Sequence, residues 1–502
     1  MPSSPDPDAV PSERAAVHSG ATAPVTESWP PSSTLRRRLG LGLLLGIVVL
    51  VGVVGVAAAG NGMTLSKQSR DAMTVPRWLY LLTGGGVIGA SAALASVVTN
   101  RKFVRSVQTW SRPGPAANRL WRPLRRIGQA LGVLALVLAV VVGLTGPQLP
   151  AASLTVLLTF VVVRAGLPMV TYLGGNLWPT LNPWRTLLAP LPGGFLPYPR
   201  GLHRWPAVGG LLLLVWVEVI FPVSTVPRVL ALAILGYTAL TAAGAVLFGP
   251  ETWFDNGDPL SVLFEVFGTI APVQGGPNGL VFTRPGSVSA SGTFTHPSDL
   301  AFVIGLIWEL TYSGAITTAP GAAAIRTLVQ ATDLGVLGTD TRAVLVYSVL
   351  LFGGFFVFLG AFWTAGVLSR RVTGTYLTVR RIVVAFGPPL VAIAAGYHLA
   401  HYVGLVLSLS PALGMALTAP LAPPTNPLVL APPGWFDALD IAFVLLGHVL
   451  AIWEAHASAF ETFASRLVAI RSQYPFVAVM IGYTVLSLWI LSLPSATPPF
   501  LP

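Results

Sequence analysis

The chain has 502 residues, of which 53% are hydrophobic and only 9% are charged, and its mean hydropathy is +0.73. A soluble domain carries roughly 25% charged residues, so a chain this poor in charge cannot cover a globule with polar surface. The composition therefore excludes a soluble globular protein and indicates a membrane protein.

The charge is strongly basic, with a formal net value of +11 and a pI near 10.4. In a soluble protein this would suggest a nucleic-acid partner. Here the basic residues gather between apolar runs, where membrane topology and anionic lipid account for them, so we expect no nucleic-acid partner. Cysteine is absent. Any bound metal must therefore use His, Asp, Glu or backbone ligands.

Residues 1–35 are rich in Pro, Ser, Ala and acidic residues and have no periodic apolar pattern, which predicts a disordered N-terminal tail. Three arginines at 36–38 then precede an apolar run over 39–60. This run is interpretable as a first transmembrane helix or as the apolar part of a signal peptide ending near 57–59. Its length of about 22 residues exceeds the usual ~7–15 of a signal peptide, so we favour the helix.

Residues 36–502 form the predicted membrane domain. Its apolar runs are unbroken, and each is near the ~20 residues with which a helix crosses the ~30 Å hydrocarbon layer. A helix satisfies its backbone polar groups internally, whereas the short alternating segments of a β-barrel are absent. The sequence predicts an all-α fold, a polytopic bundle of about eleven transmembrane helices. After the first run, the expected spans are 78–99, 127–146, 151–172, 206–222, 226–248, 299–316, 343–368, 382–410, 440–458 and 476–493.

The charges between these spans predict an orientation. If the N-terminus lies inside, the arginines gather in inner loops, while the outer loop 146–150 has no charge and 411–439 has only Asp437. This is the distribution that the positive-inside rule describes. We therefore expect a multi-pass protein of the plasma membrane with a cytoplasmic N-terminus. The basic residues of the expected inner loops are Arg101, Lys102, Arg105, Arg112, Arg119, Arg122, Arg125, Arg126, Arg185, Arg200, Arg204, Arg370, Arg371, Arg380, Arg381, Arg466 and Arg471.

Three stretches do not fit simple spans. Within 249–298, the apolar segment 259–273 is too short to cross and has Glu265 in its middle, so we expect it to be re-entrant or interfacial. Residues 321–338 are only half apolar and are expected to lie flat on the membrane. The apolar outer loop 411–439 is expected to pack against protein or the headgroup layer.

The inner loop 174–185, with the sequence GGNLWPTLNPWR, combines helix-breaking Gly and Pro with two Trp. Tryptophan prefers the headgroup layer, so we favour an interfacial anchor. The alternative is a docking surface or a lid over a cavity.

Ionisable side chains inside a bilayer are energetically costly, so their positions are informative. His398 and His401 share a helix face, and counting from the helix ends places His401 and His448 about 12 Å below the outer surface, near the level of Glu309. If these helices adjoin, the imidazoles of His398, His401 and His448 could bind Zn, Cu or Fe. Glu309 would then be a ligand, an orienting partner or the catalytic base for a metal-bound water.

Other interpretations of these polar residues are open. We favour hydrogen bonding between helices, a role that suits Tyr402 beside His401, over the metal site and over bis-His haem b. Glu454 and His456 lie deeper. They would either extend a polar path from His448 or, as we favour, snorkel to the interface.

Arg164 lies in the middle of the fourth span and Glu218 in the fifth. A buried arginine without a partner is costly, so we expect a carboxylate beside it. The different depths of the two residues leave a direct pair open, and we favour structural pairing over a substrate role.

A series of short motifs occurs between about 175 and 490, whereas nucleotide-binding, zincin, serine-elbow and Rossmann motifs are absent. In chain order the motifs are Asn176-Leu177-Trp178, Asn182-Pro183-Trp184-Arg185-Thr186, Gly257-Asp258-Pro259, Ala271-Pro272-Val273, Arg284-Pro285, Ala400-His401-Tyr402, Gly447-His448-Val449-Leu450, Ala455-His456, Ser472-Gln473-Tyr474-Pro475 and Gly482-Tyr483-Thr484. Together they resemble the fenitrothion hydrolase-like family of polytopic membrane proteins.

The resemblance implies an integral membrane protein that hydrolyses an organophosphate triester, and it makes the histidines better candidates. The chain departs from the family pattern at Ala457 and Ser458, where Asp-Arg is expected. It departs again at 308–314, where Phe-Asp-Gly is expected, which puts Glu309 in doubt as a family residue.

Three functions follow as hypotheses. The first is a metal-dependent membrane hydrolase of phosphotriester-like substrates that uses Glu309 and the three histidines. The second is a transporter or permease component in which Arg164, Glu218 and the histidines line a path. The third is a haem-binding redox subunit. Each has the lipid bilayer as a partner and leaves room for other membrane subunits, and the sequence does not identify the small-molecule substrate.

Overall fold

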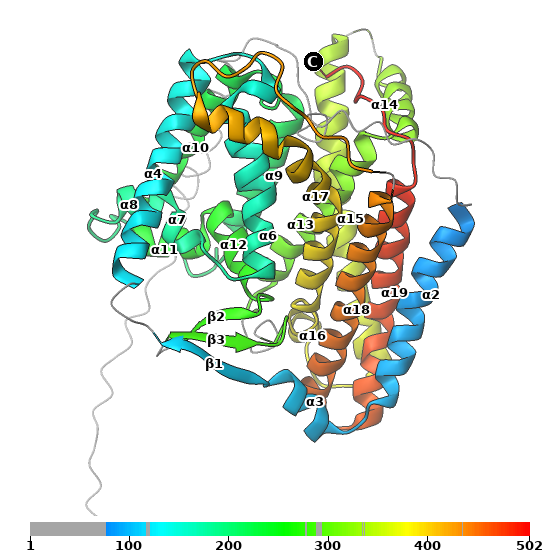
Figure 1. The fold of residues 1–502 in the computed structure, drawn as a ribbon. Coiled ribbons are helices and arrows are strands. Elements are labelled where there is room, and N and C mark those ends of the chain that lie inside the picture. The colour runs from blue at the N-terminus through cyan, green and yellow to red at the C-terminus, as the bar shows by residue number, and fades with distance from the viewer. Residues whose placement is uncertain are drawn as a thin grey trace, which may run out of the picture. The chain divides into compact units, whose positions relative to one another are not determined.

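The protein is described by a computed structural model over residues 77–116, 121–276, 279–287, 294–333, 335, 337–433 and 435–501. The predicted N-terminal tail, the arginines at 36–38 and the first apolar run lie outside the described residues. The described part belongs to one compact unit and is a bundle of helices (Figure 1). The predicted all-α fold class is confirmed.

Nine of the ten spans predicted in the described part of the chain each overlap one continuous helix, whereas the predicted span 382–410 covers the end of one helix, Val379–Ala385, a break at 386–388 and most of the next, Pro389–Thr418. Among the described residues, eight helices are long and apolar enough to cross a membrane. They are α4 (Trp121–Thr145), the continuous helix of α5 (Leu154–Val156), η3 (Leu157–Gly166) and α6 (Leu167–Leu173), α10 (Pro227–Phe248), α13 (Pro297–Ile316), α15 (Thr339–Thr373), α17 (Pro389–Thr418), α18 (Phe436–Thr462) and α19 (Arg466–Leu491).

Two further spans correspond to α2 (Arg77–Val97) and the shorter α9 (Trp205–Ile220). Outer helices expose large apolar side chains, such as Leu131 on α4 and Val349 and Phe356 on α15. Because water would solvate this surface poorly, its natural environment is lipid. The protein is therefore a polytopic helical membrane protein.

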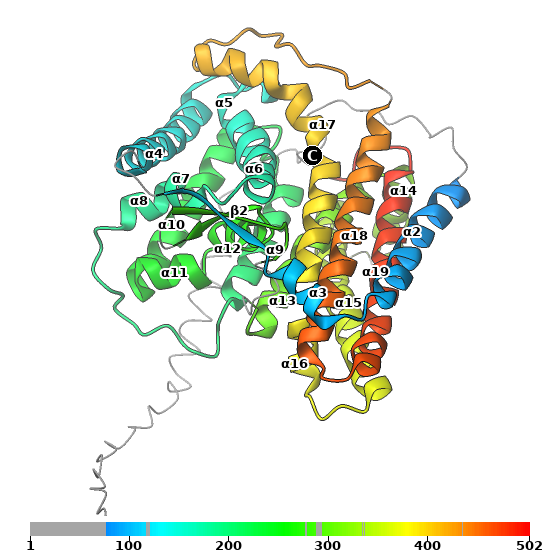
Figure 2. The ribbon, with the colours of Figure 1, turned by 60° about the horizontal axis from the view of Figure 1, so that its bottom comes forward.

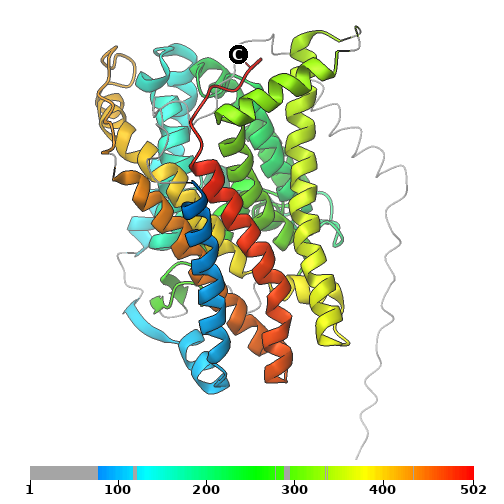
Figure 3. The same cartoon turned by 90° about the vertical axis from the view of Figure 1, so that its right-hand side faces the viewer.

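Two of the basic connections, those that contain Arg101–Gln108 and Val379–Ala385, lie at the same end of the bundle. Figure 3 shows α3 (Arg101–Gln108) and α16 (Val379–Ala385) at that end, whereas α14 (Ala319–Ala331) and the C-terminal residues lie at the other. α14 buries Ala322, Ile325 and Val329 on one face and exposes its other face. The arrangement agrees with the predicted loop charges, while the cytoplasmic N-terminus and the plasma membrane stay predictions.

The stretch 249–298 contains short elements instead of a span. α11 (Pro250–Asn256) and α12 (Pro259–Gly268) precede two strands, β2 (Val273–Gly276) and β3 (Gly279–Thr283). These strands form an antiparallel sheet with β1 (Ser111–Ala116), in the order β1-β3-β2. The sequence did not predict the sheet, because its strands are short and rich in Gly and Pro. α12 is buried in protein through Val262, Phe264 and Phe267.

The inner loop 174–185 forms two short helices, α7 (Trp178–Leu181) and α8 (Pro183–Leu188). Trp178 is 4% exposed and stacks on Phe264, and the Trp184 indole donates to the Thr238 hydroxyl at 2.8 Å. Both rings are covered by protein, so the favoured interpretation of an interfacial anchor is wrong.

The outer end of α17 extends beyond the predicted limit at residue 410. The helix continues through Pro411 to Thr418, and Figure 2 shows that its last turns bend away from the main axis. Pro411 has no N–H for the Leu407 carbonyl, which instead accepts the Ser410 hydroxyl at 2.9 Å. The outer loop is therefore shorter than 411–439. A one-turn helix, η2 (Pro150–Ala152), lies in the connection between α4 and α5.

α17 and α18 cross at two glycines. A Cβ atom at Gly447 would lie 2.6 Å from the Ala392 carbonyl oxygen and 3.1 Å from the Gly396 Cα. Contacts this short are available only to glycine, and small residues are the usual means of close helix packing in membranes. The crossing holds in place the two helices that carry His398, His401 and His448.

We expect Gly447→Ala to lower stability by about 1–3 kcal/mol, because the added methyl group overpacks this crossing. The midpoint of thermal unfolding in detergent measures the effect. Gly482→Ala in α19 is the matched control, since its Cβ would meet nothing within 4 Å. Equal unfolding midpoints for the two variants would contradict the close crossing.

The two ends of the bundle can be assigned by labelling, because the natural chain has no cysteine. Lys102 and Arg371 are exposed at one end and Leu149 and Thr425 at the other. We expect single cysteines at 102 and 371 to react with a membrane-impermeant maleimide only in inside-out vesicles. Cysteines at 149 and 425 should react on whole cells. Reaction of 102 and 371 from opposite sides would refute the arrangement.

Candidate functional site

Three ionisable side chains meet inside the bundle. Arg164 of η3 places Nη2 3.1 Å from Glu218 Oε2 of α9 and in an ion pair with Glu309 Oε1 of α13. The carboxylate side chains are only 9% and 6% exposed. The expected carboxylate partner of Arg164 is thus confirmed, and the pair with Glu218 that the sequence left open does form.

The position of Arg164 follows from an irregular helix. η3 is a π-helix, in which the Leu167 N–H donates to the Val162 carbonyl five residues earlier. Two residues after its end, Pro168 has no N–H to donate to the Arg164 carbonyl. That carbonyl accepts instead from His398 Nε2 of α17 at 2.9 Å. A neighbouring helix therefore satisfies the group that the proline leaves without its α-helical partner.

The hydrogen bonds of His398 determine its tautomer. Nε2 must carry a hydrogen, because a carbonyl can only accept. In the neutral ring Nδ1 is then the acceptor for the Tyr172 hydroxyl of α6, at 3.2 Å. Both ring nitrogens are engaged, so His398 connects α17 to η3 and α6. The interpretation as an interhelical hydrogen-bonding residue is confirmed for this histidine.

Tyr402 completes the surroundings of the charged cluster. Its ring centroid lies 5.4 Å from the Arg164 guanidinium carbon and 4.7 Å from the His398 ring. An aromatic face attracts a cation electrostatically, more strongly where water is excluded. The arginine thus has two carboxylates and one ring as neighbours.

His401 and His448 are held differently from His398. Their Nδ1 atoms face the carbonyls four residues earlier in their own helices, Tyr397 at 3.2 Å and Val444 at 2.8 Å. Nδ1–H is the donor in each case, so Nε2 carries the lone pair. The His448 Nε2 is buried and makes no hydrogen bond within the described residues.

The structure does not gather the histidines into a metal centre. Within the described residues, no three His, Asp or Glu side chains lie close enough to hold a metal ion. His398 already uses both nitrogens, and Glu309 is paired with Arg164. The arrangement gives no support to a metal held by the three histidines, and the Zn, Cu, Fe and haem b hypotheses stay predictions.

Glu454 and His456 are 1% and 0% exposed, so the favoured interpretation that they snorkel to the interface is wrong. Glu454 pairs with Arg284 and accepts from the Gln108 amide at 3.0 Å. His456 lies 2.9 Å from the Val98 carbonyl oxygen. The segments that carry Gln108 and Arg284 cover Glu454.

Sequence reasoning missed Gln108 and Arg284 as partners. Arg284 follows β3, and its guanidinium also donates to the Gln108 oxygen at 2.6 Å. An arginine in an inner loop has the same sequence signal as any other positive-inside charge. Only the motif Arg284-Pro285 singled it out.

Comparison of the chain with protein-family models found no match, and comparisons with curated proteins and with solved structures found none either. The resemblance to the fenitrothion hydrolase-like family therefore stays a prediction. What the structure establishes is a multi-pass helical membrane protein with an Arg164–Glu218–Glu309 cluster whose two carboxylates are buried.

We expect Arg164→Met to lower the free energy of unfolding by about 3–5 kcal/mol, because it leaves two carboxylates buried without a cation. The triple variant Arg164→Met/Glu218→Gln/Glu309→Gln should recover much of this loss, since it buries no charge. Thermal unfolding in detergent measures both.

Arg371→Met, at an exposed position of α15, is the control and should unfold like the natural protein. A triple variant as unstable as the single one would show that the loss comes from packing and not from unpaired charge.

Proposed function

We propose that this protein is a proton-coupled membrane transporter and that the Arg164–Glu218–Glu309 cluster is its proton-binding site. The observation that carries the proposal is the charge count: two buried carboxylates share one guanidinium. One guanidinium neutralises one carboxylate. The second leaves a negative charge in a poorly polarisable interior, and a proton is the smallest ion that can neutralise it.

The cluster joins three separate helices, so its protonation changes contacts between them. With both carboxylates ionised, Arg164 binds α9 and α13 to η3 through charge-assisted bonds. With one carboxylate protonated, the bond to that helix becomes weaker. Proton binding thereby biases the packing of α9 and α13 against η3, which is the kind of two-state element that alternating access requires.

The surrounding backbone supports this proposal. The π-helix η3 and the short helices α7, α8 and α12 interrupt the regular bundle. Transporters commonly bind ions and solutes where helices are broken, and π-helical segments are frequent at functional sites. Of the three hypotheses from the sequence, the transporter is the one whose key residues, Arg164 and Glu218, lie in contact.

The cluster's proton can be detected by infrared spectroscopy of the purified protein. At neutral pH we expect the carbonyl stretch of a buried, protonated carboxylic acid. Glu218→Gln and Glu309→Gln should each abolish it, because either leaves one carboxylate paired with Arg164. Asp255→Asn is the control, since the Asp255 side chain is 59% exposed and should not contribute to the band.

A second measurement tests transport. Proteoliposomes that enclose a pH-sensitive dye should acidify when a mixture of small metabolites is added outside, and Glu309→Gln should not. A natural protein without the infrared band, or a Glu309→Gln variant with unchanged acidification, would refute the proton-coupling role.

A further inference from the structure

A polar cavity of about 430 Å³ opens beside the inner loop 174–185. It lies between α7, α8, α11, α12 and the start of α9. Small-molecule sites typically measure ~300–1,000 Å³, so the cavity is large enough for a solute of metabolite size. The loop 174–185 contributes part of the wall.

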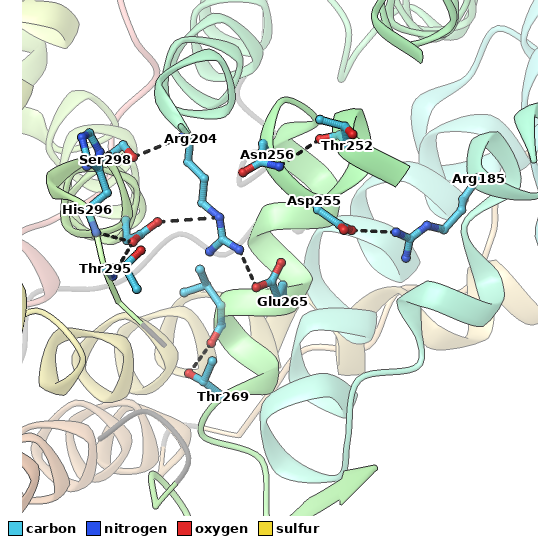
Figure 4. Close-up of polar contacts among 12 residues, drawn as sticks. Arg185, Arg204, Thr252, Asp255, Asn256, Glu265, Thr269, Thr295, His296 and Ser298 are labelled. Atoms are coloured by element: carbon cyan, nitrogen blue, oxygen red, sulfur yellow. Dashed lines mark hydrogen bonds and ion pairs between the residues drawn. The ribbon is translucent and has the colours of Figure 1, made fainter. Parts of the chain in front are cut away.

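The cavity wall carries two positive and two negative side chains (Figure 4). Arg185 Nη2 lies 2.7 Å from Asp255 Oδ1, and Arg204 Nη2 lies 2.5 Å from Glu265 Oε1. In the view of Figure 4, both carboxylates lie between the two arginines. The formal charge of the lining residues is therefore balanced, with each sign represented twice.

The four charged groups remain accessible to a ligand to different degrees. The Asp255 and Glu265 side chains are 59% and 41% exposed, and that of Arg185 is 33% exposed. Arg204 is more enclosed at 13% and is also held 3.7 Å from Asp299 Oδ1. Arg204 is thus a fixed cation, whereas the two carboxylates have free faces toward water.

Uncharged groups add further hydrogen-bonding capacity. Ser261 Oγ accepts from Asn182 Nδ2 at 3.1 Å and from the Trp178 indole at 3.4 Å, so its hydroxyl hydrogen can donate. Asn256 donates its amide N–H to the Thr252 carbonyl at 3.1 Å, so its amide oxygen can accept. The cavity therefore offers neutral donors and acceptors besides both signs of charge.

We infer that this cavity binds a small zwitterion of the amino-acid class. The ligand's ammonium group would bind Asp255 and Glu265. Its carboxylate would bind the guanidinium of Arg185, which is more exposed than that of Arg204. A solute with a single charge is attracted by the two lining residues of opposite charge and repelled by the other two. A zwitterion is attracted by both pairs. This inference rests on the proposed function, and it identifies the class of solute that the transporter would carry.

Calorimetric titration of the full-length protein in lipid nanodiscs tests the inference. The zwitterionic probes are glycine, L-glutamine and L-phenylalanine. For L-glutamine, two matched fragments each lack one charge: glutaramate lacks the ammonium group and 4-aminobutanamide lacks the carboxylate. We expect saturable binding of at least one zwitterion, and binding of L-glutamine, if it is among them, about tenfold or more tighter than that of either fragment.

Substitutions in the cavity wall test whether the zwitterion binds there. Glu265→Gln and Arg185→Gln should each weaken the bound zwitterion about tenfold, through loss of one charge-assisted contact. Arg200→Gln, at an exposed position of the same inner connection but outside the cavity lining, should bind like the natural protein. Absence of binding by all three zwitterions, fragments that bind as tightly as L-glutamine, or unchanged binding in both variants would overturn the inference.

The outcome is separable from that of the proton-coupling proposal. Glu309→Gln leaves the cavity intact, because Glu309 does not line it, and should bind the zwitterion normally. Zwitterion binding without the infrared band would refute the proton site alone. The band without zwitterion binding would refute the cavity's ligand alone.

Discussion

The position of one arginine inside an apolar bundle, with its side chain only 21% exposed, is the constraint on which the rest of this structure depends. A guanidinium cannot lose its charge, so Arg164 must find compensation wherever the fold places it. Two carboxylates, one from α9 and one from α13, and an aromatic ring from α17 lie around its guanidinium. Four helices that are separated in sequence therefore meet at Arg164. Any rearrangement of the bundle must keep the positive charge of Arg164 compensated.

The backbone near the cluster is subject to a related constraint, because a backbone carbonyl inside the membrane needs a hydrogen-bond donor. Pro168 removes one donor near Arg164, and His398 replaces it from another helix. Pro411 removes another in α17, and the hydroxyl of Ser410 replaces it locally. The hydrogen bond from His398 connects two helices, whereas the hydrogen bond from Ser410 lies within α17, where the helix bends. The buried histidine that resembled a metal ligand is thus explained by a proline on a different helix.

The ion pairs outside this cluster differ in their exposure to water. Arg204 and Arg185 are paired at the wall of an open cavity, where water reaches the carboxylates. Arg284, which follows β3, is paired with Glu454, whose side chain is only 1% exposed. Ion pairs exposed to water contribute little stability, whereas buried ones are costly to break. The open pairs can therefore exchange partners with a ligand, and the enclosed pair holds the sheet to α18.

The amino-acid sequence by itself determined the helical class, nine of the ten described spans and the identity of the costly intramembrane groups. Those features depend on local composition and on the thickness of the bilayer, both of which can be read along the chain. The tertiary structure alone decided that Arg164 meets both Glu218 and Glu309, that His398 faces a freed carbonyl and that Trp178 and Trp184 are buried. Which helices adjoin, and how each is rotated, depends instead on packing between segments that are tens to hundreds of residues apart, so a pair such as Arg164 and Glu218 could not be assigned from the sequence.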